Sequence, residues 1–280
     1  MSVPPGLPVP VDWAPSPQEV EPECKLAAVQ AVTAALTVPP DASSSLPRPL
    51  APLARLLPAA GPTAVQVLYP QYGGLSRDRR RACVVLTVDL WSSTPTALRR
   101  EGSTLDVRLQ RDGRWRDGRW RVVEVLVPDA VRSVQPVPAP AAAVLQNPRI
   151  AMPALARLDV AGGLVDDRVL TLLTALSARW ELSVQVFAAG HPWDVFETGR
   201  PSNHTLGRAV DLHALDGVPV VDQDVAGPAP WRELALAAEE LGSDEIGGPD
   251  RARRRRPFFT DDVHRDHVHL GFEFPAHPGL

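Results

Sequence analysis

The chain has 280 residues, of which 44% are hydrophobic and 22% charged, a composition typical of a globular protein that buries a core and not of a chain disordered throughout. The 29 lysines and arginines against 33 acidic residues give a formal net charge of −4, so the overall charge indicates neither nucleic acid nor a membrane surface as the partner. Because a domain usually has about 100–200 residues, we expect two domains.

The cysteines and the N-terminus bear on the cellular compartment. Cys24 and Cys83 are too few for a disulfide scaffold; one bridge would fit, but two free buried thiols are the simpler expectation. No stretch of 18 apolar residues predicts a transmembrane helix. The first residues lack the basic start and unbroken apolar core of a signal peptide, so the sequence leaves open export by another route, an upstream start and an intracellular protein.

Proline divides the chain. The 31 prolines are about twice the usual share of roughly 5%, and they cluster at residues 4–22, 39–62 and 128–153. The segment around VQPVPAPAAAV has the composition of a semi-rigid, extended linker. We therefore predict a Pro-rich tail over 1–22, an accessory α+β domain over 23–130, a linker over 131–150 and a second domain over 151–280.

The first domain begins with a helical apolar stripe over 24–37. Strand-like runs follow at 84–91, 105–110 and 121–127. Between the last two stands a tandem pentapeptide, RDGRW repeated over 111–120, whose Asp-Gly pairs predict a hairpin turn with the second copy inserted in the loop.

A helix followed by a meander ending in DGRWRVVEV resembles the cone-shaped domains of the nuclear-transport-factor-2-like superfamily. The resemblance covers about 100 residues and implies an α+β fold. No polar or metal-binding constellation stands here, so an accessory or structural role is expected. Arginine runs at 77–81 and 251–256 are interpreted as solvated loops without a functional role.

The second domain mixes short helices and strands. A helix is predicted over 165–180, a strand over 182–187, and then a loop over 188–206, long enough to be functional. Further elements are a strand over 208–212, a helix over 231–241 and a strand over 266–272. Their irregular order indicates an α+β domain of about 130 residues with a small antiparallel sheet.

Histidine is concentrated in this domain. Five of the seven histidines lie in two segments, SNHTLGRAVDLHAL (202–215) and VHRDHVHLGF (263–272). Strand alternation places Asp211 and His213 on one face, opposite the apolar side chains, and His267 and His269 likewise share a face. A tight turn at Gly207 would bring His204 toward Asp211.

Two imidazoles and one carboxylate suit a catalytic Zn²⁺, because three protein ligands leave the fourth position for water. A carboxylate such as Asp266, three residues before His269, can take the proton of that water. Any one of these histidines alone is more simply a surface residue of a loop or strand, but the whole set favours a metal site.

The pattern Ser202-x-His204-x-x-Gly207-x-Ala209-x-Asp211, followed by Asp266-His267-Val268-His269, resembles the M15 group of zinc D-alanyl-D-alanine carboxypeptidases and endolysin peptidases, which share a fold with murein endopeptidases and the hedgehog signalling domain. The resemblance covers roughly residues 150–275. It implies zinc ligands His204, Asp211 and His269, a general base Asp266, and His264 or His267 beside the water or the developing oxyanion. It also implies hydrolysis of peptide bonds next to D-amino acids in peptidoglycan, hence a place in the cell envelope or outside the cell.

One feature departs from the M15 pattern. Many members carry a substrate-binding arginine at the end of the strand before the histidine motif, where this chain has FAAGH. Arg200 is the candidate replacement, with Ser202 as a second substrate contact, because a guanidinium clamps a carboxylate bidentately; Arg200 is equally well explained as a loop residue. A zinc-binding but non-catalytic module therefore remains an alternative, and a third assigns the main function to the first domain as a ligand pocket or dimerisation unit.

Overall fold

The computed structural model describes residues 6–37, 46–58, 61–94, 97–113, 118–129, 136–223 and 229–275. The chain divides into two compact units, the first made of 1–15 and 21–129 and the second of 16–20 and 130–280. Both units are α+β, as expected. No helix of the described ranges is long and apolar enough to cross a membrane.

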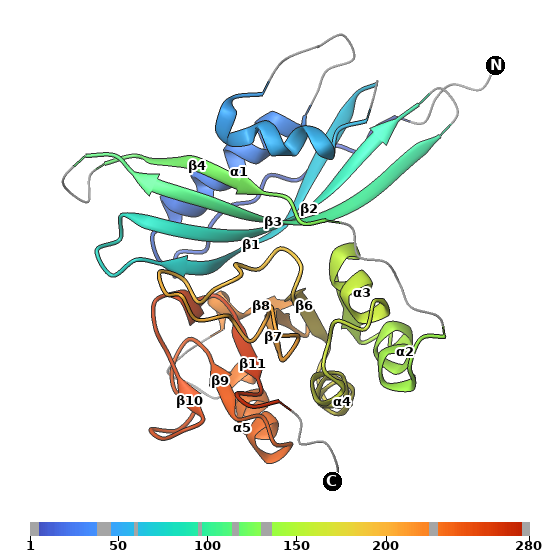
Figure 1. Ribbon diagram of the computed structural model, residues 1–280, viewed down its shortest axis with the longest axis vertical. Coiled ribbons are helices and arrows are strands. Elements are labelled where there is room, and N and C mark those ends of the chain that lie inside the picture. The colour runs from blue at the N-terminus through green and yellow to red at the C-terminus, as the bar shows by residue number, and fades with distance from the viewer. Residues whose placement is uncertain are drawn as a thin grey trace. The chain divides into compact units, whose positions relative to one another are not determined.

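Unit 1 is a four-stranded antiparallel meander with a helix against it (Figure 1). Helix α1 (Pro22–Leu36) starts with a proline, which suits a first turn, and lies across one face of the sheet. The strands are β1 (Thr63–Leu75), β2 (Arg81–Ser93), β3 (Leu98–Arg111) and β4 (Trp120–Leu126). The expected helix and three expected strands are confirmed; the resemblance to nuclear-transport-factor-2-like domains stays a prediction.

Two elements of unit 1 escaped the sequence analysis. Strand β1 contains Pro70 and a Gly pair, which normally argue against a strand, and the sheet tolerates them because β1 is an edge strand with two register shifts. The 3₁₀ helix η1 (Arg48–Arg55) lies in a proline cluster and buries Leu53. Both cysteines are buried and free, so the simpler expectation is confirmed.

The tandem pentapeptide forms the β3–β4 hairpin, although its tip at 114–117 lies outside the described residues. The second copy is not wholly loop, which corrects the expectation: its last residue, Trp120, opens β4 and is buried. The guanidinium of Arg111, from the first copy, lies 4.6 Å from the centre of the Trp120 ring. This cation–π contact places part of the repeat in the sheet.

Unit 2 holds a seven-stranded sheet in the order β10-β9-β11-β7-β6-β5, with β8 beside β7. The strands are β5 (Ile150–Ala151), β6 (Leu182–Val186), β7 (Ala209–Leu215), β8 (Val218–Pro219), β9 (Glu245–Gly247), β10 (Phe258–Phe259) and β11 (Val268–Gly271). The four central strands are antiparallel, as predicted, whereas both edge pairs are parallel. The sheet is therefore mixed.

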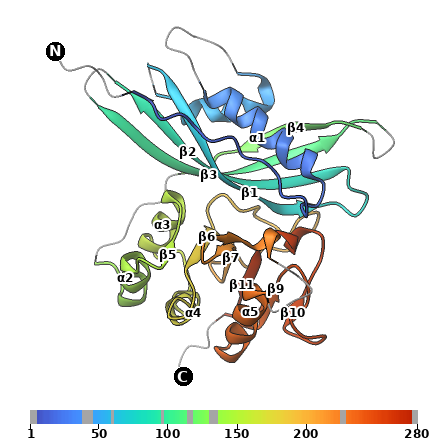
Figure 2. The same cartoon turned by 180° about the vertical axis from the view of Figure 1, so that it is seen from behind.

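The helices of unit 2 are α2 (Ala139–Gln146), α3 (Ala154–Ala161), α4 (Asp167–Leu176), α5 (Pro230–Glu240) and the 3₁₀ turns η2 (Val220–Asp222) and η3 (Val263–Arg265). Figure 2 shows α2, α3 and α4 grouped together and α5 near β9 and β11. One core joins the four α-helices and η2 to the apolar sides of β7 and β11, where Val210, Leu212, Val268 and Leu270 are completely buried.

The predicted linker over 131–150 is wrong in its second half. Residues 139–146 form α2, whose Ala141 and Val144 are buried in the core of unit 2. A proline-opened, alanine-rich run is a good helix former once its apolar side chains find a surface to pack on. Composition alone suggested an extended segment; residues 131–135 lie outside the described ranges.

Candidate metal centre

Strands β7 and β11 bring two of the expected ligands face to face. In their antiparallel register, His269 pairs with Asp211. Side chains of directly opposed residues lie on the same face of a sheet, so both project away from the apolar side that carries Leu212 and Leu270. As a result Nδ1 of His269 lies 3.0 Å from Oδ1 of Asp211.

The third expected ligand, His204, comes from the loop before β7. Its carbonyl accepts the backbone N–H of Gly207, which has a φ of 71° and closes the turn onto the strand. A Cβ at Gly207 would stand 2.0 Å from the carbonyl oxygen of Leu164, so a larger residue would push the turn away. The turn places Nε2 of His204 at 3.1 Å from both Asp211 Oδ1 and His269 Nδ1.

The outer ring nitrogens fix the tautomers of both histidines. Nδ1 of His204 lies 2.6 Å from the carbonyl oxygen of Phe187, which can only accept, so this nitrogen carries the hydrogen. Nε2 of His269 lies 3.4 Å from Oε2 of Glu245, whose carboxylate also accepts the side-chain amide of Asn203. When both rings are neutral, their remaining lone pairs therefore point at each other and at Asp211.

Three converging lone-pair donors need a cation between them. The pairwise distances of 3.0–3.1 Å approach the edge of about 3.3 Å that a tetrahedron with metal–ligand bonds of about 2.0–2.1 Å would have. Imidazoles whose far N–H groups are held by a carbonyl and a carboxylate are also typical of metal ligands. The donor set fits a metal ion.

A further histidine joins this cluster. His191, His204 and Asp211 form a triad that could hold a metal ion, with one donor atom from each all within 4.8 Å of one another. The His191 ring stacks on that of His204 at 4.0 Å between centroids and 15° between planes. His191 was not an expected ligand; His204 and Asp211 were.

A second polar group lies beside the ligands. Nδ1 of His267 donates to Oδ1 of Asp266 at 2.5 Å, and its Nε2 lies 3.7 Å from the other oxygen of Asp211. The His264 ring is 4.9 Å from that of His267, and its Nδ1 lies 2.7 Å from Asp261. The structure thus gathers all three expected metal ligands with Asp266, His264 and His267.

Burial and close partners shift the pKa values of the metal-free cluster. Burial alone would lower the pKa of His269, but its contacts with Asp211 and Glu245 raise it to about 10. Burial opposes ionisation of Glu245, yet the contacts with His269 and Asn203 lower its pKa to about 2. The pKa of Asp211 is held well below its usual value by the surrounding histidines, against the effect of burial. The cluster thus binds a positive charge, either a proton or a metal.

The two expected substrate-binding residues, Arg200 and Ser202, have different environments. Arg200 is exposed, and its guanidinium makes no hydrogen bond or ion pair with any described residue. Ser202 is buried, and its hydroxyl accepts the backbone N–H of His204 at 3.3 Å. Ser202 therefore supports the ligand loop, whereas Arg200 stands apart from the cluster contacts.

Sequence reasoning missed His191, Glu245 and Asn203. Asn203 adjoins the expected ligand His204, and His191 ends the FAAGH segment that the sequence had already singled out, so both were within reach of the sequence. Glu245 gave none, because it lies in β9, a three-residue strand that is defined only by its pairing with β10 and β11. Together these residues complete the surroundings of the expected triad.

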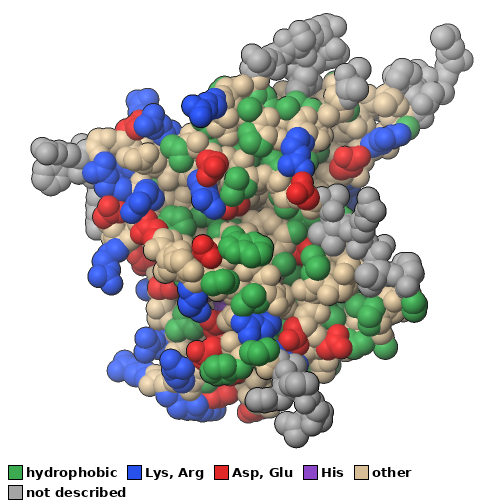
Figure 3. Space-filling view, in the orientation of Figure 1, with side chains coloured by type: hydrophobic (Ala, Val, Ile, Leu, Met, Phe, Trp, Pro, Cys, Tyr) green, Lys and Arg blue, Asp and Glu red, His purple; other side chains and the backbone are tan. Residues whose placement is uncertain are grey.

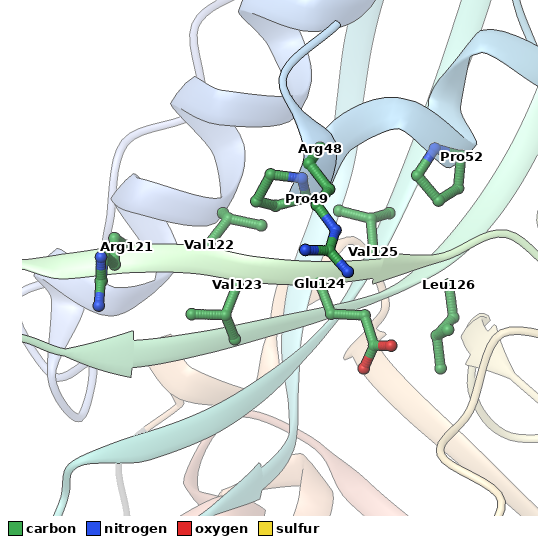
Figure 4. A pocket seen from close by; sticks show the side chains of 9 residues that line it. All are labelled: Arg48, Pro49, Pro52, Arg121, Val122, Val123, Glu124, Val125 and Leu126. Carbon is green, nitrogen blue, oxygen red and sulfur yellow. The ribbon is translucent and has the colours of Figure 1, made fainter.

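Two further surface features of the described residues are a groove in unit 1 and a basic patch in unit 2. Unit 1 has a groove of about 520 Å³ between η1 and β4, lined mainly by proline and valine with Arg48, Arg121 and Glu124 (Figure 4). In unit 2, basic side chains gather over the segment before β10 (Figure 3), where Arg253 and Arg255 pair with Glu239.

Comparison of the chain with known family models, curated proteins and solved structures gave no match.

Proposed function

We propose that this protein is a zinc-dependent peptidase that hydrolyses peptide bonds next to D-amino acids in peptidoglycan stem or cross-link peptides. The observation that carries the proposal is the triangle of His204 Nε2, Asp211 Oδ1 and His269 Nδ1, with sides of 3.0–3.1 Å. Two nitrogens and one oxygen suit zinc, and three protein ligands are the number that catalytic zinc sites use. A bound zinc lowers the pKa of water toward neutrality and polarises a carbonyl.

Side chains of this protein can transfer the protons that the hydrolysis requires. Asp266 follows η3 and precedes β11, so it is held three residues before the ligand His269. We assign it as the base that takes a proton from the attacking water. The hydrogen bond of 2.5 Å that His267 Nδ1 donates to Oδ1 of Asp266 holds the carboxylate in place, and Asp266 returns the proton to the leaving amine.

The ring of His264 is held in a fixed orientation beside His267. Its Nδ1 is fixed on Asp261, and its ring packs edge-on against Phe259 at 4.7 Å between centroids. Burial lowers the pKa of His264 below its ordinary value, although Asp261 opposes this shift, so burial favours the neutral ring. With Nδ1–H directed at Asp261, its Nε2 is left as an acceptor beside His267. The neutral Nε2 of His264 can therefore accept a proton beside His267.

The substrate class follows from the resemblance of the histidine motifs to M15 peptidases. Cleavage next to D-amino acids would involve a peptide that ends in, or branches at, a carboxylate. Arg200 is the candidate clamp, because its free guanidinium is available for a bidentate contact. Such a contact requires the exposed loop to approach the bound peptide.

A non-catalytic zinc-binding recognition module is the second candidate. The observation that favours it is the absence of arginine at the end of β6, where the chain continues with Phe187 and two alanines, together with the exposed setting of Arg200. Such a module would bind zinc and peptide without cleaving.

The deciding experiment combines zinc analysis with digestion of purified peptidoglycan and D-Ala-D-Ala peptides, the products being identified by mass spectrometry. We expect one zinc per chain and cleavage by the wild type, and in Asp266→Ala retained zinc with loss of cleavage. Metal-free protein from a zinc-replete preparation would overturn the proposal. Zinc-loaded wild type that binds these peptides intact would favour the recognition module.

A further inference from the structure

His191 is the unassigned member of the metal cluster. It lies on the connection after β6, which is neither helix nor strand, and it is half-buried whereas His204 and His269 are buried. Its ring stacks on His204 at 4.0 Å, and a ring nitrogen lies within 4.8 Å of donor atoms of both His204 and Asp211. The side chain therefore reaches the place where the three expected ligands meet.

The hydrogen bonding of His191 leaves one nitrogen available. Its Nδ1 lies 2.9 Å from the carbonyl oxygen of Pro192, which can only accept, so Nδ1 carries the hydrogen. In the neutral ring Nε2 then holds a lone pair, and the described residues offer it no hydrogen bond. A nitrogen of this kind cannot donate to an oxyanion or clamp a carboxylate, but it can bind a metal.

We propose that His191 is a fourth protein ligand of the metal held by His204, Asp211 and His269, and that it closes the metal site in the resting protein. The identity of the metal as zinc rests on the proposed function. Four protein ligands are the pattern of closed zinc sites, whereas catalytic sites keep one position open. Hydrolysis would then require that water or the substrate carbonyl oxygen replaces the His191 nitrogen.

The geometry also indicates which ligand leaves. The donor atoms of His191, His204 and Asp211 all lie within 4.8 Å of one another, so the His191 nitrogen lies near the candidate metal position. His204 is anchored through Phe187 and His269 through Glu245, whereas the only hydrogen bond that the described residues give the His191 ring is to the carbonyl of its own neighbour, beside its stacking on His204. His191 is therefore the ligand that exchanges most easily.

The test counts imidazoles at the metal. Zinc X-ray absorption of the full-length wild type should show three imidazoles, and His191→Phe should show two with an oxygen in the vacated position. Phenylalanine keeps a flat ring on His204 without a donor nitrogen, so it separates ligation from stacking. Zinc affinity of His191→Phe, measured by competition with a chelator, should fall at least about tenfold. Trp193→Ala, an exposed side chain on the same loop, is the matched control and should behave as wild type.

The outcomes separate this inference from the proposed function. Two imidazoles in the wild type, a count that needs no variant, would overturn the role of His191 whether or not peptide is cleaved. Three imidazoles, with cleavage faster in His191→Phe than in wild type at saturating zinc, would support both. Three imidazoles without cleavage by either protein would support the fourth ligand and refute the peptidase. Absence of bound zinc would overturn both.

Discussion

Asp211 and His269 occupy opposed positions in the β7–β11 ladder, and their side chains meet at 3.0 Å on the polar face of the sheet. The backbone pairing itself thus sets the distance between two candidate metal ligands. The fully buried Leu212 and Leu270 on the opposite face hold that register, because a shift of one residue would exchange the two faces.

Asp211→Asn is expected to abolish tight metal binding. The amide keeps the size of the carboxylate but loses the charge that three neighbouring imidazoles and a cation require. Zinc affinity should fall by more than the roughly 10–100-fold that is typical when a residue behind a ligand is lost. Chelator competition measures the change, and retained secondary structure by circular dichroism is the control. Unchanged affinity would remove Asp211 from the ligand set.

Glu245→Gln tests the residue behind His269. The carboxylate accepts from Nε2 of His269 at 3.4 Å and from Asn203, and it fixes the tautomer that turns Nδ1 toward the metal. We expect zinc affinity to fall about 10–100-fold with the fold intact. Glu240→Gln, an exposed position at the end of α5, is the matched control and should bind as wild type. Equal affinities in the two variants would contradict the role of Glu245.

The buried His213 side chain should make the folded protein less stable as the pH falls. Burial lowers its pKa from the usual 6.5 to about 4, so the unfolded chain takes up a proton at a higher pH than the folded protein does. The folded state is therefore favoured above pH 6.5, and this advantage is lost as the pH falls toward 4. For the metal-free protein, His213 should contribute about 2 kcal/mol to the loss between pH 7 and pH 5.

Urea unfolding of chelator-treated wild type and His213→Gln at both pH values measures this difference. The variant should lose less stability on acidification than the wild type. Parallel losses in the two proteins would show that His213 is not responsible.

Asp159→Ala should loosen the segment that carries His191. The buried Asp159 accepts the backbone N–H groups of Ala188 and Ala189 at 3.0 and 2.9 Å, next to the carbonyl of Phe187 that holds His204. Two partly buried donors lose their acceptor, so we expect a destabilisation of about 1–3 kcal/mol and weaker zinc binding. Asp167→Ala, exposed in the first turn of α4, should cost less than about 1 kcal/mol. Thermal unfolding that fails to distinguish the two would contradict this role.

Sequence pattern predicted the long, regular elements because each carries its own periodicity. Helix α4 and strand β6 were found with shifts of only a few residues at their ends, because most of their apolar side chains enter one core. Strand β1 was missed because proline inside a strand is allowed only at a sheet edge, and edge position is decided by pairing with β2. Helix α2 was missed because its composition also suits an extended linker.

For the candidate metal site, the sequence by itself singled out His204, Asp211, His269 and the carboxylate Asp266, through strand alternation around Asp211 and His269 and through the resemblance of both motifs to M15 peptidases. Only the tertiary structure decided which nitrogen of each ring points inward, that Glu245 lies behind His269, and that His191 rather than Arg200 stands at the cluster. These features depend on contacts between segments far apart in the chain, and local periodicity carries no information about such contacts.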